Sequence, residues 1–166
     1  VASRGLGDVY KRQPYEQLEQ AYAPYLDKAD PLSFPLKIKS LAANEYTFWR
    51  GSKDLFFQWS KTHCADWLAD KDAFVPNHGD LHLGNIGTYV SEDGWGNLAF
   101  GMVDFDDSAR LPFELELLQG VITIDLVARQ NNLELTDAQR QSIHTKLFDT
   151  YRTAVNSRRN ATEMLK

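Results

Sequence analysis

Apolar side chains recur every three or four positions in two stretches of the N-terminal half of the chain. The first stretch, residues 14–29, is expected to form a short amphipathic helix that Pro31 and Pro35 bring to an end. The second stretch, residues 41–69, is expected to form two helices or one bent helix, since Gly51 weakens its middle. The large apolar residues expected to be buried in this second stretch are Phe48, Leu55, Phe56, Trp59 and Trp67.

Shorter apolar runs follow, and their lengths are typical of β-strands. Residues 73–76 are expected to form a buried strand that leads the chain to His78. Residues 86–90 and 98–104 are expected to pair as a hairpin, because the segment between them is rich in Gly, Asp and Asn, as turns require.

Two further helices are predicted in the C-terminal part of the chain. Pro112 suits the first turn of a helix, and residues 113–130 are apolar on nearly every face, which indicates burial. Thr136 and Gln139 have the spacing of a capping box at the start of the last helix. One face of that helix is marked by Ile143, Leu147, Tyr151 and Val155. The chain is therefore predicted to have an α+β fold.

The charge of the chain argues against two classes of partner. It has 18 Lys and Arg against 23 Asp and Glu, a net charge of -5, whereas nucleic acids and anionic lipids are bound by clustered Lys and Arg. No apolar run approaches the length of a membrane span, and the single cysteine, Cys64, cannot form an internal disulfide. We therefore expect a cytoplasmic protein with no nucleic-acid or membrane partner.

The first 13 residues are not expected to come from the natural protein. The run from Ser3 to Gln13 resembles the in-frame translation of a transposon adapter used in sequencing libraries, so residues 1–13 are expected to be non-native. Without them the chain has 15 Lys and Arg and 22 Asp and Glu, which makes the net charge about -7. Residues 14–166 are expected to be a partial domain, truncated at the N-terminus and also at the C-terminus.

Candidate chemistry is concentrated in His78–Asn85 (HGDLHLGN) and in Met102–Asp107 (MVDFDD). Phosphoryl transfer needs a carboxylate that orients or deprotonates the attacking hydroxyl, and oxygen ligands for the magnesium that bridges the terminal phosphates. Asp80 can serve the first purpose, and Asn85 and Asp104 the second. An Asp followed five residues later by Asn, in a loop after a strand, has the spacing of the kinase catalytic loop, and an Asp at the end of the next hairpin completes such a site.

Together the two segments resemble the aminoglycoside and choline kinase signature, HGDLHxGN followed by a hydrophobic-Asp-Phe motif. Flanking residues narrow the resemblance to the family called domain of unknown function 2252, which belongs with the kinase-like proteins. The matching positions are Phe48–Gly51 (FWRG), Gly79–Tyr89, Val103–Asp107, Pro112 and Glu116, and the similarity runs from about Ala43 to about Val155.

This resemblance implies roles for individual residues and a fragment of a kinase-like fold. Asp80 would be the catalytic base, Asn85 and Asp104 the Mg²⁺ ligands, and His78 a support for the catalytic loop. ATP would be the phosphoryl donor, although the family's glycine-rich segment and nucleotide-binding lysine match no residue here. The nucleotide-binding residues are therefore unknown, and the nucleotide-binding lobe is expected to be missing.

Two positions depart from the family pattern. The family usually has Asp and, three residues on, Arg, whereas this chain has Glu116 and Gln119. The supporting ion pair or loop contact at this point is therefore expected to differ.

Other readings of the same residues stay open. His78, Asp80 and His82 form an H-x-D-x-H pattern that a zinc-dependent hydrolase could use, although His63 and His144 are not spaced to complete such a site.

The roles of two supporting residues also have two interpretations each. Asp106, like its neighbour Asp107, either joins the metal site or caps the turn before Pro112. Arg50 either pairs with a loop carboxylate or a phosphate, or is a structural or surface arginine.

The sequence favours an ATP-dependent phosphotransferase that acts on a hydroxyl of an unknown small molecule or protein. The fragment by itself is expected to be inactive. The alternatives are a pseudokinase or nucleotide-binding module without catalysis, and a metal-dependent hydrolase built on the HGDLH motif.

Overall fold

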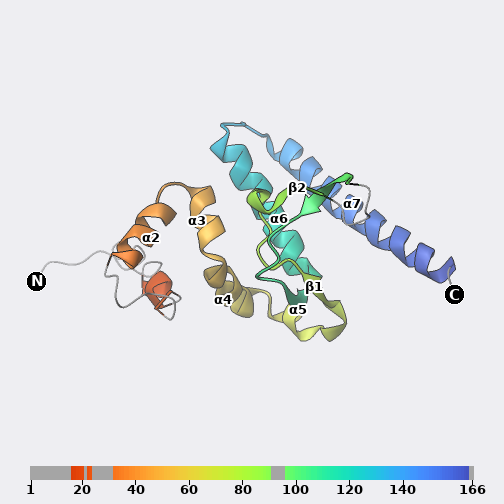
Figure 1. Ribbon diagram of the computed structural model, residues 1–166, viewed down its shortest axis with the longest axis horizontal. Helices are drawn as coiled ribbons and strands as arrows, with labels where there is room; N and C mark the ends of the chain where they lie inside the picture. The colour runs from red at the N-terminus through yellow and green to blue at the C-terminus, as the bar shows by residue number, and fades with distance from the viewer. Residues whose placement is uncertain (1–15, 21, 24–31, 91–95, 165–166) are drawn as a thin grey trace, which may run out of the picture. The chain divides into compact units, whose positions relative to one another are not determined.

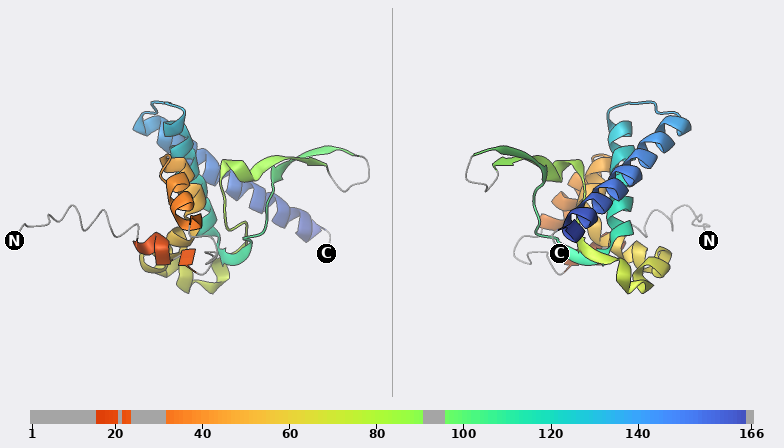
Figure 2. Two further views of the ribbon diagram at one scale, coloured as in Figure 1. Left: turned by 60° about the vertical axis from the view of Figure 1, so that its left-hand side comes forward. Right: turned by 90° about the vertical axis from the view of Figure 1, so that its right-hand side faces the viewer.

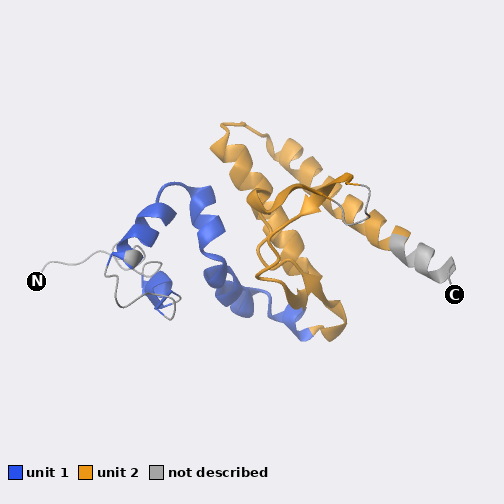
Figure 3. Cartoon of the chain, in the orientation of Figure 1, with its two compact units in different colours: residues 1–69 blue, residues 70–166 orange. Residues whose placement is uncertain are grey.

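A computed structural model describes residues 16–20, 22–23, 32–90 and 96–164. The chain divides into two compact units, Val1–Ala69 and Asp70–Lys166, coloured separately in Figure 3. The described part combines helices with two small antiparallel sheets, as the predicted α+β class requires. Residues 1–13, predicted to be non-native, and most of the first predicted helix lie outside the described residues.

Unit 1 contains a series of helices between residues 32 and 69: α2 (Ser33–Leu41), α3 (Glu45–Gly51), α4 (Lys53–His63) and α5 (Ala65–Ala69) (Figure 1). The prediction of helix from residue 41 missed α2. Pro35 is tolerated there because it lies in the first turn, where backbone N–H groups have no partner within the helix. Asn44 begins α3, since its side chain accepts a hydrogen bond from Thr47 N–H at 2.8 Å.

The buried face of α4 differs from the prediction. Phe56 and Ser60, one turn apart, are buried, whereas Trp59 is 46% exposed and Phe48 on α3 is 37% exposed. The Trp59 ring lies parallel to the His63 ring at 4.5 Å, on the exposed side of the helix. The prediction that Phe48 and Trp59 are buried was wrong because it used side-chain size rather than the helix face that packs inward.

Unit 2 is built around two strand pairs. β1 (Phe74–Asn77), which follows η2 (Lys71–Ala73), pairs with β4 (Ala109–Pro112) in the register Phe74↔Pro112 to Asn77↔Ala109. β2 (Ile86–Val90) pairs with β3 (Leu98–Met102) from Ile86↔Met102 to Val90↔Leu98, and this ribbon projects from the rest of the unit (Figure 2). The predicted hairpin is confirmed, while β4 was not predicted.

The remaining elements of unit 2 are the helices α6 (Phe113–Gln130) and α7 (Asp137–Met164). The capping box predicted at the start of α7 is confirmed, because Thr136 N–H donates to Gln139 Oε1 at 2.9 Å and Gln139 N–H donates to Thr136 Oγ1 at 3.2 Å. α6 packs against α7, with the Phe113 and Tyr151 rings stacked 5.8 Å apart. α6 therefore has α7 on one side and the strands and their connecting loop on another.

Candidate functional site

The chain enters the candidate site from β1 and later leaves it through β4 into α6. Asn77 ties the two strands together at this end, since its Nδ2 donates to Leu111 O on β4 at 2.6 Å and to Val75 O at 3.1 Å. The loop that starts at His78 is therefore held beside the first turns of α6. It ends in the 3₁₀ turn η3 (Leu83–Asn85), from which β2 starts.

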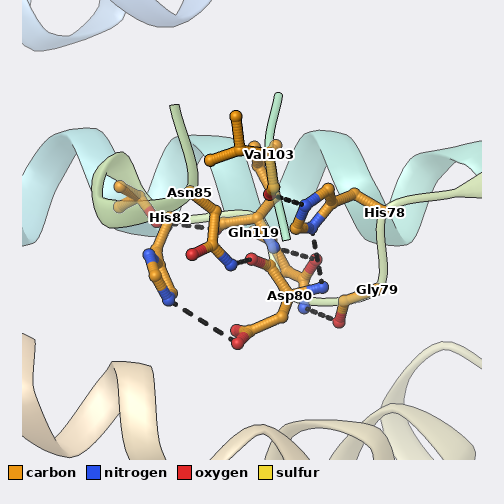
Figure 4. Close-up of polar contacts among 9 residues, drawn as sticks. His78, Gly79, Asp80, His82, Asn85, Val103 and Gln119 are labelled. Atoms are coloured by element: carbon orange, nitrogen blue, oxygen red, sulfur yellow. Dashed lines mark hydrogen bonds and ion pairs between the residues drawn. The ribbon is translucent and has the colours of Figure 1, made fainter. Parts of the chain in front are cut away.

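Three side chains bind the backbone on both sides of Asp80 (Figure 4). On the N-terminal side, Gln119 Nε2 donates to Gly79 O at 3.1 Å, and Asp80 N–H donates to His78 Nδ1 at 3.4 Å. On the C-terminal side, Asn85 Nδ2 donates to Asp80 O at 2.9 Å, and Leu81 N–H donates to Gln119 Oε1 at 3.3 Å. The predicted residues His78, Asp80 and Asn85 are thus brought together in one loop.

His78 is held by hydrogen bonds on both sides of its ring. Its Nε2 donates to Val103 O at 2.8 Å, since a carbonyl oxygen can only accept. Its Nδ1 accepts from Asp80 N–H at 3.4 Å. Both ring nitrogens are engaged within the protein, and the Phe105 ring packs against the imidazole at a centroid distance of 5.1 Å.

Val103 connects the two halves of the motif. Its N–H donates to Asn85 O at 2.9 Å, and its carbonyl accepts from His78. The next residue, Asp104, therefore starts beside the loop that carries Asp80. Asp104 is exposed and has a φ of 65°, a left-handed conformation that is uncommon for a residue other than glycine.

The Asp80 side chain points away from its hydrogen-bonded backbone and toward His82 (Figure 4). Its Oδ2 lies 3.6 Å from His82 Nε2, and the Asp80 side chain keeps 19% exposure while that of His82 keeps 4%. A carboxylate on a fixed backbone, still reached by solvent, can accept a proton or a hydrogen bond from a bound molecule.

One face of α6 contacts the loop through residues three and four positions apart. Glu116 Oε2 accepts from His78 N–H at 3.2 Å, and Thr123 Oγ1 donates to Leu81 O at 3.1 Å, with Gln119 between them. Burial raises the pKa of the Glu116 carboxyl, and the hydrogen bond and the nearby ring of His78 offset part of that rise. Burial, together with the charges of Glu116 and Glu114, likewise raises the pKa of Tyr151 on α7.

Gly79 allows a third segment to approach the loop. It has a φ of 85°, and a Cβ at this position would overlap the carbonyl oxygen of Asp107. The segment after Asp104 therefore packs directly on the backbone next to Asp80.

Comparison with known families gives a match over most of the chain. The family model described as "Uncharacterized protein conserved in bacteria (DUF2252)" matches residues 29–165. The chain belongs to this family. No match was found among curated proteins or among solved structures.

The two positions at which this DUF2252 chain was expected to differ from its family both contact the loop. Glu116 accepts from the backbone of His78, and Gln119 both donates to and accepts from the backbone next to Asp80. An arginine at position 119 could donate to Gly79 O but could not accept from Leu81 N–H. At position 119 the contact with the loop is a glutamine amide bonded to two backbone groups.

Two other predicted supporting residues of the DUF2252 chain, Asp106 and Arg50, are exposed. Asp106 is exposed within a turn in which Ser108 N–H donates to Phe105 O at 3.0 Å, and both of its predicted roles stay predictions. Arg50 is exposed in the last turn of α3, in unit 1, so its reading as a partner of the loop stays a prediction.

The site offers oxygen atoms that could hold a metal ion. Among the described residues, no three His, Cys, Asp or Glu side chains lie close enough together to hold a metal ion. Asn85 and Asp104 offer an amide and a carboxylate oxygen, and Mg²⁺ is commonly held by one or two such protein ligands together with substrate phosphates and water. The donor types fit magnesium with a phosphate ligand.

Three contacts in this site were not found by reasoning from the sequence: those of Val103, Gln119 and Thr123. Val103 acts through its backbone, which a sequence pattern does not reveal. Gln119 was visible as a departure from the family pattern, and Thr123 was visible as a polar residue between two apolar neighbours in α6. In the part of the chain that the structure describes, no helix is both long and apolar enough to cross a membrane.

Proposed function

We propose that this DUF2252 protein is an ATP-dependent phosphotransferase of kinase-like fold, which transfers a phosphoryl group to a hydroxyl of a small molecule or protein. The observation that carries the proposal is the junction at Val103, which ties Asp104 to the loop that displays Asp80. Asp80, Asn85 and Asp104 are thereby carried by backbone segments that hydrogen bonds join. Asp80 and Asn85 are separated in the sequence as in the kinase catalytic loop. The kinase comparison is an analogy of motif and geometry.

Each side chain has a distinct part in the proposed reaction. Asp80 first accepts a hydrogen bond from the acceptor hydroxyl and then takes its proton. The hydroxyl oxygen bonds to the terminal phosphorus of ATP, and the bond from that phosphorus to the ADP oxygen breaks. Asn85 and Asp104 would hold magnesium, which supplies positive charge to the phosphate oxygens. His78 keeps the loop and the Asp104 segment together through Val103 O.

The engagement of His78 favours phosphoryl transfer over a zinc hydrolase. A zinc site on the H-x-D-x-H pattern needs an unprotonated ring nitrogen of His78 that faces the metal. In this structure one nitrogen of His78 donates to Val103 O and the other accepts from Asp80 N–H. Zinc binding through either nitrogen would require the contact of that nitrogen to break.

The first test measures nucleotide binding by the full-length protein. Calorimetric titration with ATP should give binding that depends on magnesium. Asp104→Ala should weaken it at least about tenfold, since a charged ligand of the ion is lost. The control is Glu134→Ala, which removes one negative charge beyond the C-terminal end of α6 and should leave binding unchanged.

A second variant separates catalysis from binding. Asp80→Asn should retain magnesium-dependent ATP binding and lose phosphotransfer by about 10²-fold or more, because the amide cannot take the proton. Magnesium-dependent ATP binding by wild-type protein without phosphotransfer would leave a nucleotide-binding module, and transfer unaffected by Asp80→Asn would overturn the role of Asp80. Stoichiometric zinc that is lost with His82→Ala would replace the proposal by the hydrolase.

A further inference from the structure

The two peptide groups that flank Asp80 have all four of their polar atoms bonded to side chains. These atoms are Gly79 O and Asp80 N in the first peptide, and Asp80 O and Leu81 N in the second. Gln119 holds one atom in each peptide, and this side chain is only 3% exposed, so water has little access to replace it.

We propose that Gln119 is a positioning residue that fixes the direction of the Asp80 carboxylate. This inference rests on the proposed function for its catalytic meaning. The direction of a side chain follows from φ and ψ of its residue, and these are set by the planes of the two flanking peptides. A single carboxamide bonded to both planes restricts both angles at once.

The chemistry of glutamine suits this position. Its carboxamide carries a donor and an acceptor, so Nε2 serves Gly79 O while Oε1 serves Leu81 N–H. A glutamate lacks the donor for Gly79 O, and a methionine of similar length lacks both strong groups. Each loss would leave a backbone group of the loop without its side-chain partner.

Neighbouring contacts provide a matched control. Thr123 lies one turn further along α6 and donates to Leu81 O at 3.1 Å, a group of the next peptide that does not flank Asp80. Thr123→Val removes a hydrogen bond between the same helix and the same loop. It leaves both peptides around Asp80 with their partners.

The test measures amide hydrogen exchange by NMR in the full chain. Gln119→Met should speed exchange at Leu81 N–H by about tenfold or more relative to core amides, as expected for the loss of one hydrogen bond. Thr123→Val should leave exchange at Leu81 N–H close to wild type. Unchanged exchange at Leu81 in Gln119→Met would overturn the proposal.

If Gln119→Met does not fold, Gln119→Glu takes its place. The carboxylate can still accept from Leu81 N–H but cannot donate to Gly79 O, so Leu81 should stay protected while Asp80 N–H, in the peptide whose carbonyl has lost its donor, exchanges faster. Equal protection of both amides in Gln119→Glu and wild type would contradict the positioning role.

A kinetic measurement tests whether the positioning serves catalysis. In the complete protein, phosphate release from MgATP with water as acceptor should show a kcat about tenfold lower in Gln119→Met with an unchanged KM, whereas Thr123→Val should keep its kcat. A raised KM with normal kcat would overturn the catalytic meaning. Inactive wild-type protein would sink the proposed function, while the exchange measurement would still decide whether Gln119 holds the loop.

Discussion

At the scale of single residues, Gly79 sets the geometry of the loop. Its φ of 85° lies in the left-handed region, and the space where a Cβ would sit is taken by the backbone of Asp107. A side chain at this position would be strained by the left-handed backbone conformation. It would also clash with the backbone of Asp107, which cannot rotate away as a flexible side chain could.

Gly79→Ala should lower the free energy of unfolding by at least about 2 kcal/mol, because strain and overlap add. The control is Gly87→Ala on β2, where a Cβ would meet nothing within 4 Å; its effect should stay within about 0.5 kcal/mol. Urea denaturation of both variants measures the difference. Equal stabilities of the two variants would show that the loop can move away from Asp107.

The residues of the candidate site were predictable to different degrees. The fixed spacing of His78, Asp80 and Asn85 made them visible in the sequence, and the structure brings them into one loop. The role of Gln119 depends on contacts across 38 and 40 residues, which are created by the pairing of β1 with β4. No local pattern contains that pairing, so the departure at position 119 was visible and its purpose was not.

At the scale of elements, the same contrast between local and distant causes holds. The strand β2 and the helix α6 were predicted with correct bounds, because apolar runs and adjacent turn residues mark both. β4 was missed because its four residues include Arg110 and Pro112 and show no strand pattern by themselves. It exists because β1 lies beside it and because Asn77 binds Leu111 O.

The N-terminal half of α6 carries a half-buried carboxyl, Glu116, whose charge costs stability. Because burial raises the Glu116 pKa above its ordinary 4.5, the folded state holds that proton more tightly than the unfolded state. The stabilisation from protonation is fully present below the ordinary pKa. It is lost as the pH rises through the raised pKa of the folded state.

Glu116→Gln should therefore raise the free energy of unfolding at pH 7, and its advantage over wild type should shrink as the pH falls toward 4. The amide oxygen can still accept from His78 N–H. Urea denaturation across this pH range provides the measurement, with Glu134→Gln, at an exposed position, as the control. An advantage for Glu116→Gln that grows toward acid pH would mean that the hydrogen bond to the charged carboxylate outweighs the cost of its burial.

At the scale of the whole molecule, the side chains and backbone that hydrogen-bond the loop belong to the same compact unit as the loop. Glu116, Gln119 and Thr123 on α6 and Val103 after β3 hold the loop, and each lies within Asp70–Lys166. The geometry around Asp80 is thus specified by contacts inside one compact unit.

We accordingly expect residues 70–166, expressed alone, to retain the protected amide of Leu81. Hydrogen exchange of this shorter chain, compared with that of residues 1–166, measures the outcome directly. A dispersed NMR spectrum with Leu81 protected is the expected result. Loss of dispersion in the shorter chain would mean that unit 1 is needed to fold the loop.

The junction at Val103 has a consequence for how this family can vary. Asn85 and His78 both form hydrogen bonds with the backbone of Val103, just before Asp104. The separation of Asp80 from Asp104 therefore does not depend on the length of the ribbon formed by β2 and β3. Residues added in pairs, one to each strand, would keep the alternation of faces and leave that separation intact. The ribbon is therefore a place where evolution, or an engineer, can add residues that contact a new ligand without moving Asp104 relative to Asp80.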